Sequence, residues 1–536
     1  MIAQERAAST RAHAFLHRRA FVSVAAAIAL GVTPGCGAPP RIPNTAVIAS
    51  GADLESGNPT VTIHPLSRQL QRHALFVTLV RLDSLLQPVP YFARGWSWSA
   101  DRRSVTMQLE ATLRWHDGAE TTASDVVFTL DAVRDSSLGS PRRGDLSTIE
   151  SVQALGRHSV MIRFREPAPR LPTVFAELPI VPRHLLDSVP RERWRAHAFS
   201  TAPVGNGPFR FVERVAGRRW RFARNARFPM AMGGPPRLQQ LVVSVVDEAA
   251  TKYAGLVSGE LDLAGISPVM AHLVERDPAL VLLTPPVLFS TMLVFNTSRA
   301  PWDDARVRRA LSLSIDRARL VQAAVAGYAM PAAGAVPPGL PWSQASSVRP
   351  DVAAADSLLD DAGWRRRAGG PRVRGDRELA LELITVGSGD MAVEQLVQAD
   401  LAARGVTVRI RVLELAAFLA TVRAERKRFD VALTGVPGDL ALGHISALFA
   451  TSQRGGALDY TGYHAPDLDA ALAGARGADA PAAGVAWQRV DALLSDAMPV
   501  AWLYHARGVQ GKSRRLQGVT MDLRGELVSV SRWSRP

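Results

Sequence analysis

Few residues of this chain stand at a spacing that catalysis requires. Asp303 and Asp304 are adjacent carboxylates, but they come directly before a helical pattern, where Asp303 is expected to be the N-cap. Gly205 and Gly207 begin a glycine-rich pattern, but the third glycine of a dinucleotide-binding turn is missing. The sequence contains no G-x-S-x-G, no H-E-x-x-H and no P-loop pattern. We therefore predict that the protein is not an enzyme and that it holds neither a metal nor a cofactor.

Cys36 is the only cysteine of the chain, so it has no partner for an internal disulfide. It follows the adjacent Arg18 and Arg19 and an apolar stretch from Phe21 to Val32. That stretch is shorter than the about 20 residues needed to span a bilayer. The order is typical of a signal peptide over 1–35, and a cysteine directly after it indicates a lipid anchor. The alternative is a free cysteine in or beside a cleaved signal.

The two adjacent arginines also resemble the twin-arginine export consensus, and the alternative is an ordinary Sec signal. Either route exports the protein.

The net charge of +14 raises the question of nucleic-acid binding. Of the 63 Lys and Arg residues, only Lys252, Lys427 and Lys512 are lysine. The arginines are scattered in twos and threes and are not interleaved with aromatic residues, as a nucleic-acid groove would require. We predict no nucleic-acid partner. A coding bias towards arginine explains the charge equally well.

The segment 91–135 is the longest stretch in which consecutive secondary-structure elements are predicted. Alternation of Trp96 and Trp98 predicts one strand, and alternation of Val105, Met107 and Leu109 predicts a second. A turn, His116-Asp117-Gly118, follows. Thr122 and Asp125 then have the spacing of a capping box, which predicts a helix start.

Further elements follow along the chain. The segment 209–222 predicts a hairpin with Gly217 at its turn, and 379–412 predicts a parallel βαβ unit. The Gly- and Ala-rich stretch 473–484 is expected to be a surface loop.

These segments resemble the family 5 extracellular solute-binding proteins, which serve dipeptide, oligopeptide and nickel ABC importers. The residues W-H-D-G and T-A-S-D-V-V-F within 91–135 are similar to the family's F-H-D-G and T-A-x-D-V-V-F. The run from Trp302 to Arg317 is similar to its F-D-D-x-R-V-R-x-A-L-x-x-A-I-D-R, and Val204 to Phe209 to its V-G-T-G-P-Y.

The resemblance implies an α/β fold, namely a two-lobed periplasmic-binding-protein fold of the class II type with an extra α+β domain on the first lobe. The implied order is a tether and start of lobe I at 36–76, the extra domain at 77–199, lobe I again at 200–289, lobe II at 290–495 and a return to lobe I at 496–536.

The resemblance also implies the function. A solute, most simply a short peptide, is captured between the lobes and delivered to the permease of an ABC importer by a monomeric, membrane-anchored protein. An oligosaccharide, an opine or a metal complex is an alternative solute. A further alternative is an envelope protein that keeps the fold for a chaperone-like or sensing role.

Peptide-binding members hold the peptide amino terminus with an Asp in a W-x-A-D-Y-x-D-P segment. The equivalent stretch here, Leu433 to Phe449, has one carboxylate, Asp439. Its charge-assisted hydrogen bond to an ammonium contributes about 1.5–3 kcal/mol. The alternative is that Asp439 caps the turn that follows it.

Five other residues are candidates for the ligand site by the same resemblance. His64 and Arg68 belong to a loop that faces the cleft in the family, and Arg68 suits a carboxylate. Phe289 and Ser290 precede the strand into lobe II, and Trp342 is placed to cover a ligand. The alternatives are a solvated loop for the first two residues and packing for the other three.

Overall fold

The computed structural model describes residues 43–536, except 63, 341, 344–348, 368, 388–390 and 479. The predicted signal peptide, Arg18, Arg19 and the predicted lipidation site Cys36 lie outside the described residues. In the described part of the chain, no helix is both long enough and apolar enough to cross a bilayer.

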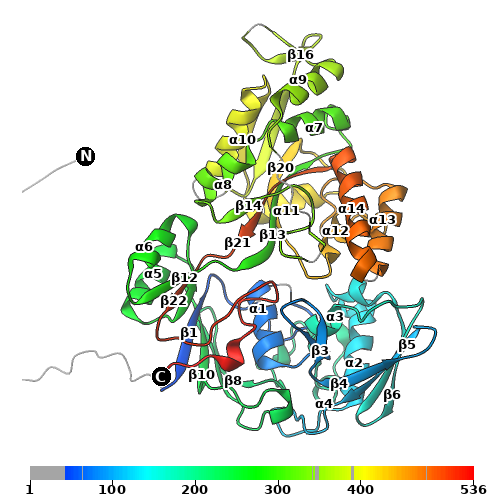
Figure 1. Cartoon of the computed structure of the whole chain (residues 1–536), viewed down its shortest axis with the longest axis vertical. Helices are drawn as coiled ribbons and strands as arrows, with labels where there is room; N and C mark the ends of the chain where they lie inside the picture. The colour runs from blue at the N-terminus through cyan, green and yellow to red at the C-terminus, as the bar shows by residue number, and fades with distance from the viewer. Residues whose placement is uncertain are drawn as a thin grey trace, which may run out of the picture. The chain divides into compact units, whose positions relative to one another are not determined.

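The first lobe is built on a mixed sheet whose described strands follow the order β12-β22-β11-β1-β10-β9-β8 (Figure 1). Strand β1 runs parallel to β10 and β11, although about 200 residues of chain separate them. The predicted hairpin is confirmed, because β8 and β9 are antiparallel and Gly217 lies between them with φ of 67°. The strands are β1 (Thr45–Ser50), β8 (Phe209–Val215), β9 (Arg219–Arg224), β10 (Gln240–Val245), β11 (Leu263–Gly265), β12 (Leu280–Leu283) and β22 (Gln510–Ser513).

The second lobe is built on a sheet whose described strands follow the order β14-β21-β13-β20-β18-β19. The predicted βαβ unit is confirmed, since β18 and β19 pair in parallel on either side of helix α10 (Ala392–Ala402). The strands are β13 (Pro286–Phe295), β14 (Ala329–Pro331), β18 (Ala380–Thr385), β19 (Thr407–Val412), β20 (Val431–Pro437) and β21 (Val500–Arg507).

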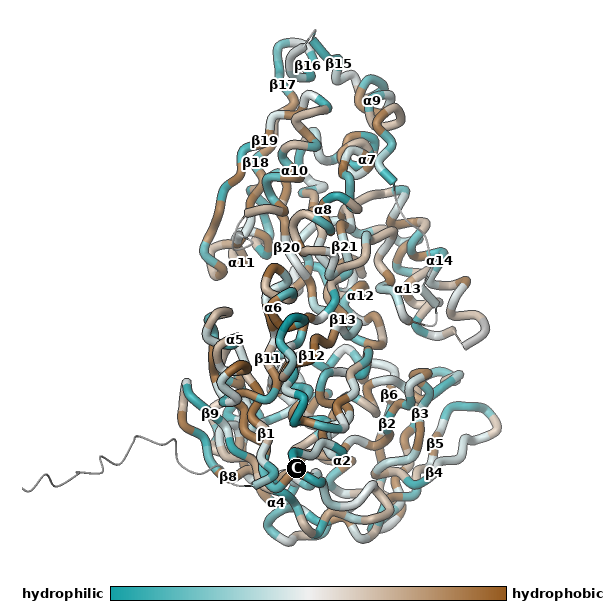
Figure 2. Tube along the Cα trace, turned by 60° about the vertical axis from the view of Figure 1, so that its left-hand side comes forward, coloured by the Kyte–Doolittle hydropathy of each residue, from teal (hydrophilic) through white to brown (hydrophobic). Residues whose placement is uncertain are grey.

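Helices cover both faces of this second sheet. Side chains of a strand alternate between faces, so Met292 and Val294 of β13 enter one hydrophobic core and Leu293 and Phe295 enter another. Both faces are therefore buried, and hydrophobic residues dominate its strands (Figure 2). The helices are α7 (Ala305–Leu313), α8 (Arg317–Val325), α9 (Val352–Asp361), α11 (Leu415–Arg423), α12 (Gly443–Phe449), α13 (Pro466–Gly477) and α14 (Ala480–Ala497).

Two local predictions in this lobe were wrong. The stretch 473–484 is mostly helical, in α13 and α14, because its alanines are strong helix formers and both helices bury apolar residues against each other. The N-cap of α7 is Asp304, whose side chain accepts a hydrogen bond from Arg306 N at 2.9 Å, and not its neighbour Asp303.

The extra domain is an antiparallel sheet, β4-β5-β7-β6, with helix α2 (Ala123–Arg134) against it. The predicted strands and capping box are confirmed: Thr122 precedes α2, and Thr122 N donates to Asp125 at 2.8 Å. Its core is continuous with the first sheet, since Met107 and Leu241 belong to one cluster. The strands are β4 (Ala93–Trp98), β5 (Ser104–Leu109), β6 (Ile149–Gly156) and β7 (Ser159–Phe164).

Smaller elements complete the described chain. These are the helices α1 (Pro65–Leu70), α3 (Val174–Glu177), α4 (Arg183–Leu186), α5 (Ala249–Ser258) and α6 (Ala271–Arg276), the pair β2 (Val80–Leu82) and β3 (Pro88–Pro90), and the ribbon β15 (Arg365–Arg366), β16 (Arg372–Arg374) and β17 (Arg377–Glu378).

The chain passes between the two sheets at two adjacent crossings. The first is 284–285, between β12 and β13, and the second is 508–509, between β21 and β22. The crossings are joined by a hydrogen bond from Gly508 N to Pro285 O, 2.9 Å long. Strand β21 thus belongs to the second sheet, although it lies beyond the predicted lobe boundary at 495.

One carboxyl group of lobe II couples stability to pH. Burial raises the pKa of Asp491 on α14 to about 6, partly offset by a hydrogen bond from Ala335 N at 2.9 Å. A raised pKa in the folded state means that the fold is favoured with Asp491 protonated. This contribution is lost as the pH rises from about 4 to about 6.

We expect Asp491→Asn to stabilise the protein at pH 7.5 by up to about 3 kcal/mol, because the amide keeps the acceptor for Ala335 N and carries no charge. At pH 4 the gain should be close to zero. Chemical denaturation of both proteins at the two pH values measures the difference. An equal effect at both pH values would contradict the assignment.

Candidate functional site

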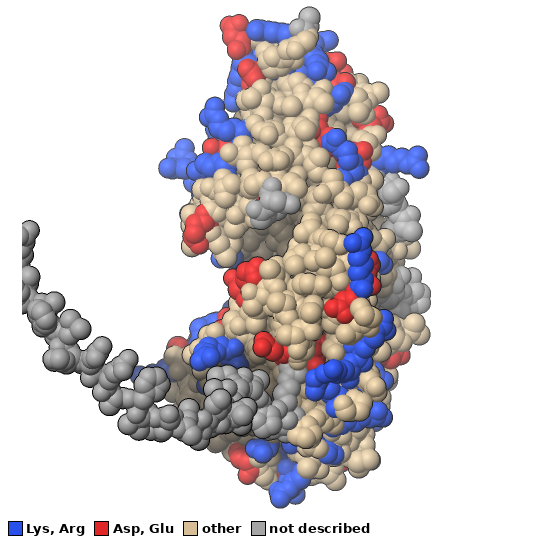
Figure 3. All heavy atoms as spheres, turned by 90° about the vertical axis from the view of Figure 1, so that its left-hand side faces the viewer, with Lys and Arg blue, Asp and Glu red and all other residues tan. Residues whose placement is uncertain are grey.

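A cleft of about 2110 Å³ is lined by residues of both sheets and of the extra domain. Single small-molecule pockets usually enclose about 300–1,000 Å³, so the cleft has room for a solute of several residues. The space-filling view shows the surface hollowed in this region, with Lys and Arg interspersed among Asp and Glu over the visible face (Figure 3). Both Lys or Arg and Asp or Glu side chains line the cleft.

An ion-pair network forms the floor of the cleft on the side of lobe I. Glu177 of α3 pairs with Arg142 at 2.8 Å and with Arg72 at 3.3 Å, and Arg142 also pairs with Asp145 at 2.7 Å. Burial of Glu177 opposes ionisation, but the charges of Arg142, Arg68 and Arg72 outweigh it and lower its pKa. The carboxylate is therefore ionised. Removing one partner of such a buried pair costs about 3–5 kcal/mol, so the network holds these segments in place.

Arg68 lies beside this network without joining it. Its half-buried guanidinium has no hydrogen bond and no ion pair with any residue that the structure describes, although Glu177, Asp439 and Asp145 lie within electrostatic reach. Burial and the charge of Arg142 lower its pKa, but an arginine remains charged at neutral pH. Arg68 is thus a cation in the cleft with all of its donors available to a ligand.

His64 positions the helix that carries Arg68. Its Nδ1 lies 3.3 Å from Ser67 N and accepts that hydrogen bond, which caps the start of α1, and its backbone N donates to Glu55 at 3.1 Å. Burial lowers the pKa of His64, so the ring is neutral and able to accept. The side chain also lines the cleft.

Asp439 lines the cleft, but its carboxylate is occupied by the turn that follows it. One oxygen accepts hydrogen bonds from Ala441 N at 2.9 Å and Gly443 N at 3.0 Å, and the other accepts from His444 N at 3.1 Å. Burial opposes ionisation, but these bonds and the His444 side chain lower the pKa of Asp439 well below its usual range. Asp439 is therefore an ionised group at the cleft wall that also caps α12.

The structure places the three remaining candidates differently. Phe289 lines the cleft, is 39% exposed and packs its ring on Gly435. Ser290 is buried, and its hydroxyl lies 2.8 Å from His505 Nδ1 instead of facing the cleft. Trp342 does not line the cleft directly and lies under Arg170, a cleft residue 5.5 Å from its ring centre.

The structure thus gathers His64, Arg68, Phe289 and Asp439 in one cleft. Arg72, Arg142, Asp145 and Glu177 also belong there and are missing from the sequence prediction. No local motif marks them, because each takes its role from partners up to about a hundred positions away. Among the described residues, no group of three or more His, Cys, Asp or Glu side chains is arranged to hold a metal ion.

Comparisons with known proteins bear on the family and the fold of the chain. A family model described as bacterial extracellular solute-binding proteins, family 5 middle region, matches residues 87–455. A putative ABC transporter peptide-binding protein of Brucella ovis is 30% identical over 284 residues, which is 53% of each chain. The alignment thus spans about half the length of these relatives. The glutathione-binding protein GsiB of Shigella boydii is 26% identical over 65% of this chain and 66% of its own.

Solved structures share the fold. NikZ from Campylobacter jejuni, in complex with Ni(L-His), superposes with a TM-score of 0.79 at 23% identity, over 91% of this chain and 99% of its own. The oligopeptide-binding protein AppA from Bacillus subtilis, in complex with a nonapeptide, superposes with a TM-score of 0.78 at 20% identity, over 93% and 100%. The two-lobed α/β prediction is confirmed.

Proposed function

Since the chain belongs to family 5 of the bacterial extracellular solute-binding proteins, we propose that it captures a short peptide or peptide-like solute between its lobes for an ABC importer. Membership of an extracellular family means that the protein is exported. In this proposal the protein is a carrier and not a catalyst, it acts as a monomer, and Cys36 anchors it to the membrane by a lipid, after Sec or twin-arginine export.

The single observation that carries the proposal is Arg68, which has no partner among the described residues and lies in a cleft walled by both lobes. A guanidinium presents donors that match a carboxylate in a two-point contact. A peptide's terminal carboxylate supplies that group. The ionised Asp439 lies close enough to act on Arg68, and its negative charge at the cleft wall favours an ammonium nearby.

The two crossings at 284–285 and 508–509 supply the motion that capture needs. At these crossings, two short stretches of backbone connect the two sheets. A rotation about two adjacent crossings closes the lobes by a hinge. A solute that contacts both lobes favours the closed arrangement, because it gains contacts there that the open arrangement lacks. Phe289 lies in β13, four residues after the first crossing, so its ring would move with lobe II during closure.

We expect a thermal-shift screen of the refolded, ligand-free full chain to identify the solute class. Di- to pentapeptides form the first arm, because the relatives include peptide- and glutathione-binding proteins. Oligosaccharides, opines and a nickel–histidine complex form the others. A ligand at about 100 times its dissociation constant stabilises the fold by about 2.7 kcal/mol.

Stabilisation by a peptide confirms the proposal. Stabilisation by a compound of another arm identifies that compound's class as the solute instead. If no arm stabilises the refolded chain, the solute-carrier proposal fails and the chaperone-like or sensing alternative takes its place.

A further inference from the structure

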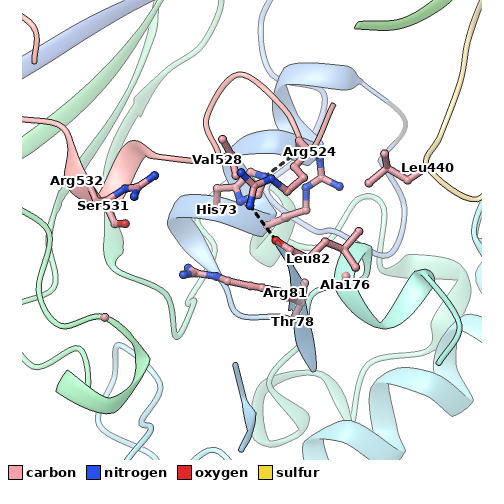
Figure 4. Close-up of a pocket in the computed structure, with 12 residues that line it drawn as sticks. His73, Thr78, Arg81, Leu82, Ala176, Leu440, Arg524, Val528, Ser531 and Arg532 are labelled. Atoms are coloured by element: carbon pink, nitrogen blue, oxygen red, sulfur yellow. Dashed lines mark hydrogen bonds between the residues drawn. The ribbon is translucent and has the colours of Figure 1, made fainter. Parts of the chain in front are cut away.

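A second cavity, of about 290 Å³, adjoins the cleft, with which it shares Arg72 and Leu440, and is lined mainly by lobe I and the extra domain (Figure 4). Its walls are the π-helical turn Gln71–Leu75, strand β2, and the C-terminal segment that ends in the 3₁₀ turn Val530–Arg532. Leu440 is its single lining residue from lobe II. The cavity is large enough for a small organic molecule.

The lining of this cavity carries positive charge with no carboxylate. Four arginines line it, and no Asp or Glu does. Two of the four are neutralised from outside the lining, Arg72 by Glu177 at 3.3 Å and Arg524 by Asp522 through Nε at 2.9 Å. The other two, Arg81 and Arg532, form no ion pair with any carboxylate in the described part of the chain.

The geometry directs the free charges at the cavity. Arg81 donates to the Tyr91 hydroxyl at 2.6 Å and stacks 3.6 Å above its ring, which holds the guanidinium in one position. Arg532 is exposed, and Figure 4 shows both guanidinium groups extending into the same space from its two sides. Two like charges that face one cavity repel each other, and an anion between them offsets that repulsion by its attraction to both.

The remaining lining is neutral and partly apolar. His73 lies 3.2 Å from the Arg524 carbonyl, so its Nε2 carries the proton and donates. Burial, with the charges of Arg72 and Arg81, keeps the pKa of His73 well below its usual range, so the ring adds no charge. Leu82, Leu440 and Val528 supply an apolar wall for a carbon skeleton.

We propose that this cavity binds a small oxyanion, a carboxylate or a phosphate, between Arg81 and Arg532. The proposal goes beyond solute capture in the cleft, because it uses arginines that do not line the cleft.

The test is anion binding by the full chain without any solute. Sodium phosphate, sodium succinate and sodium acetate are titrated at constant ionic strength, with sodium chloride as the reference salt, because screening alone changes stability. We expect at least one of the three anions to raise the thermal midpoint saturably, and chloride not to do so. A response to phosphate alone or to the carboxylates alone identifies the source of the oxyanion.

Single variants then locate the binding. Arg532→Gln removes an exposed guanidinium and leaves the fold intact. It should weaken the binding of the anion by about tenfold or more. Arg515→Gln is the matched control, since Arg515 is exposed on the same C-terminal segment and lines neither cavity. Arg68→Gln should leave the response unchanged, which separates this cavity from the cleft. Arg81→Gln should weaken the binding of the anion to the same extent as Arg532→Gln. If loss of the Tyr91 contact unfolds it, Arg532→Gln decides alone.

Two outcomes overturn the proposal. One is the absence of a saturable response to all three anions. The other is an unchanged affinity in Arg532→Gln compared with Arg515→Gln, which would assign the anion to a different place.

Discussion

Replacing Gly205 or Gly207 by alanine is expected to destabilise the first lobe by about 3 kcal/mol, the upper end for an overpacked site and a large part of the about 5–15 kcal/mol that holds a domain together. A Cβ on Gly205 would overlap the carbonyl oxygen of Leu75, and a Cβ on Gly207 would lie 2.5 Å from the carbonyl oxygen of Ala74. Both obstacles are backbone atoms, so no side-chain rotation relieves them.

The same segment is fastened to its neighbours by hydrogen bonds that a shift would break. Gly207 N donates to Leu75 O at 2.9 Å, Val77 N donates to the Asn206 side chain at 2.9 Å, and His116 N donates to Gly205 O at 2.8 Å. The π-helical turn Gln71–Leu75 carries Arg72, so the damage should extend to the floor of the cleft.

Thermal and chemical denaturation of the two variants measure the effect. Gly95→Ala is the control, because nothing lies within 4 Å of a Cβ at that strand position. Equal stability of Gly205→Ala and Gly95→Ala would show that the segment moves away without cost.

Replacing Arg68 by glutamine is expected to weaken the binding of the peptide that the screen selects by about 10- to 150-fold. This is the equivalent of about 1.5–3 kcal/mol for a charge-assisted hydrogen bond. The fold should be little affected, because the guanidinium forms no hydrogen bond or ion pair with a described residue and Arg142 and Arg72 still pair with Glu177. Arg165→Gln is the matched control, since Arg165 also lines the cleft but is exposed and donates to the Ser147 carbonyl.

Blocked peptides give this prediction a sharper form. Amidation of the carboxyl terminus should weaken binding to the natural protein and should make no further difference to Arg68→Gln, because the two changes remove the same contact. The corresponding pair for the other end is N-acetylation of the peptide and Asp439→Asn.

Calorimetric titration of the four combinations at each end gives the coupling energies. Additive losses at Arg68 would place the carboxylate elsewhere. Additive losses at Asp439 would leave that residue with its structural role, the capping of α12.

Features within about 30 residues of chain were predictable from the sequence. The capping box of Thr122 and Asp125, the hairpin around Gly217 and the parallel pair β18–β19 depend on local propensity and periodicity, and all three are confirmed. The local errors of the prediction also concern short stretches of chain. The helix start at Asp304 is one residue away from the prediction. The stretch 473–484 is mostly helical and not a loop, because its alanines are strong helix formers.

Resemblance extended the prediction to the family and the fold, and it selected residues that the structure gathers in the cleft, among them Arg68 and Asp439. It did not reveal what each residue contacts. From the sequence, Asp439 could be either a carboxylate available to a ligand or a helix cap. The structure shows three backbone N–H groups donating to it.

The sequence by itself therefore determined several local elements and, through resemblance, the family. Only the tertiary structure decided that Arg142 and Arg72 converge on Glu177 while Arg68 has no partner among the described residues. It also decided that Arg81 and Arg532, about 450 residues apart, face one cavity. The physical reason is range. Propensity and periodicity act over a few turns of chain, whereas ion pairing and burial depend on distances that exist only once distant segments have packed together.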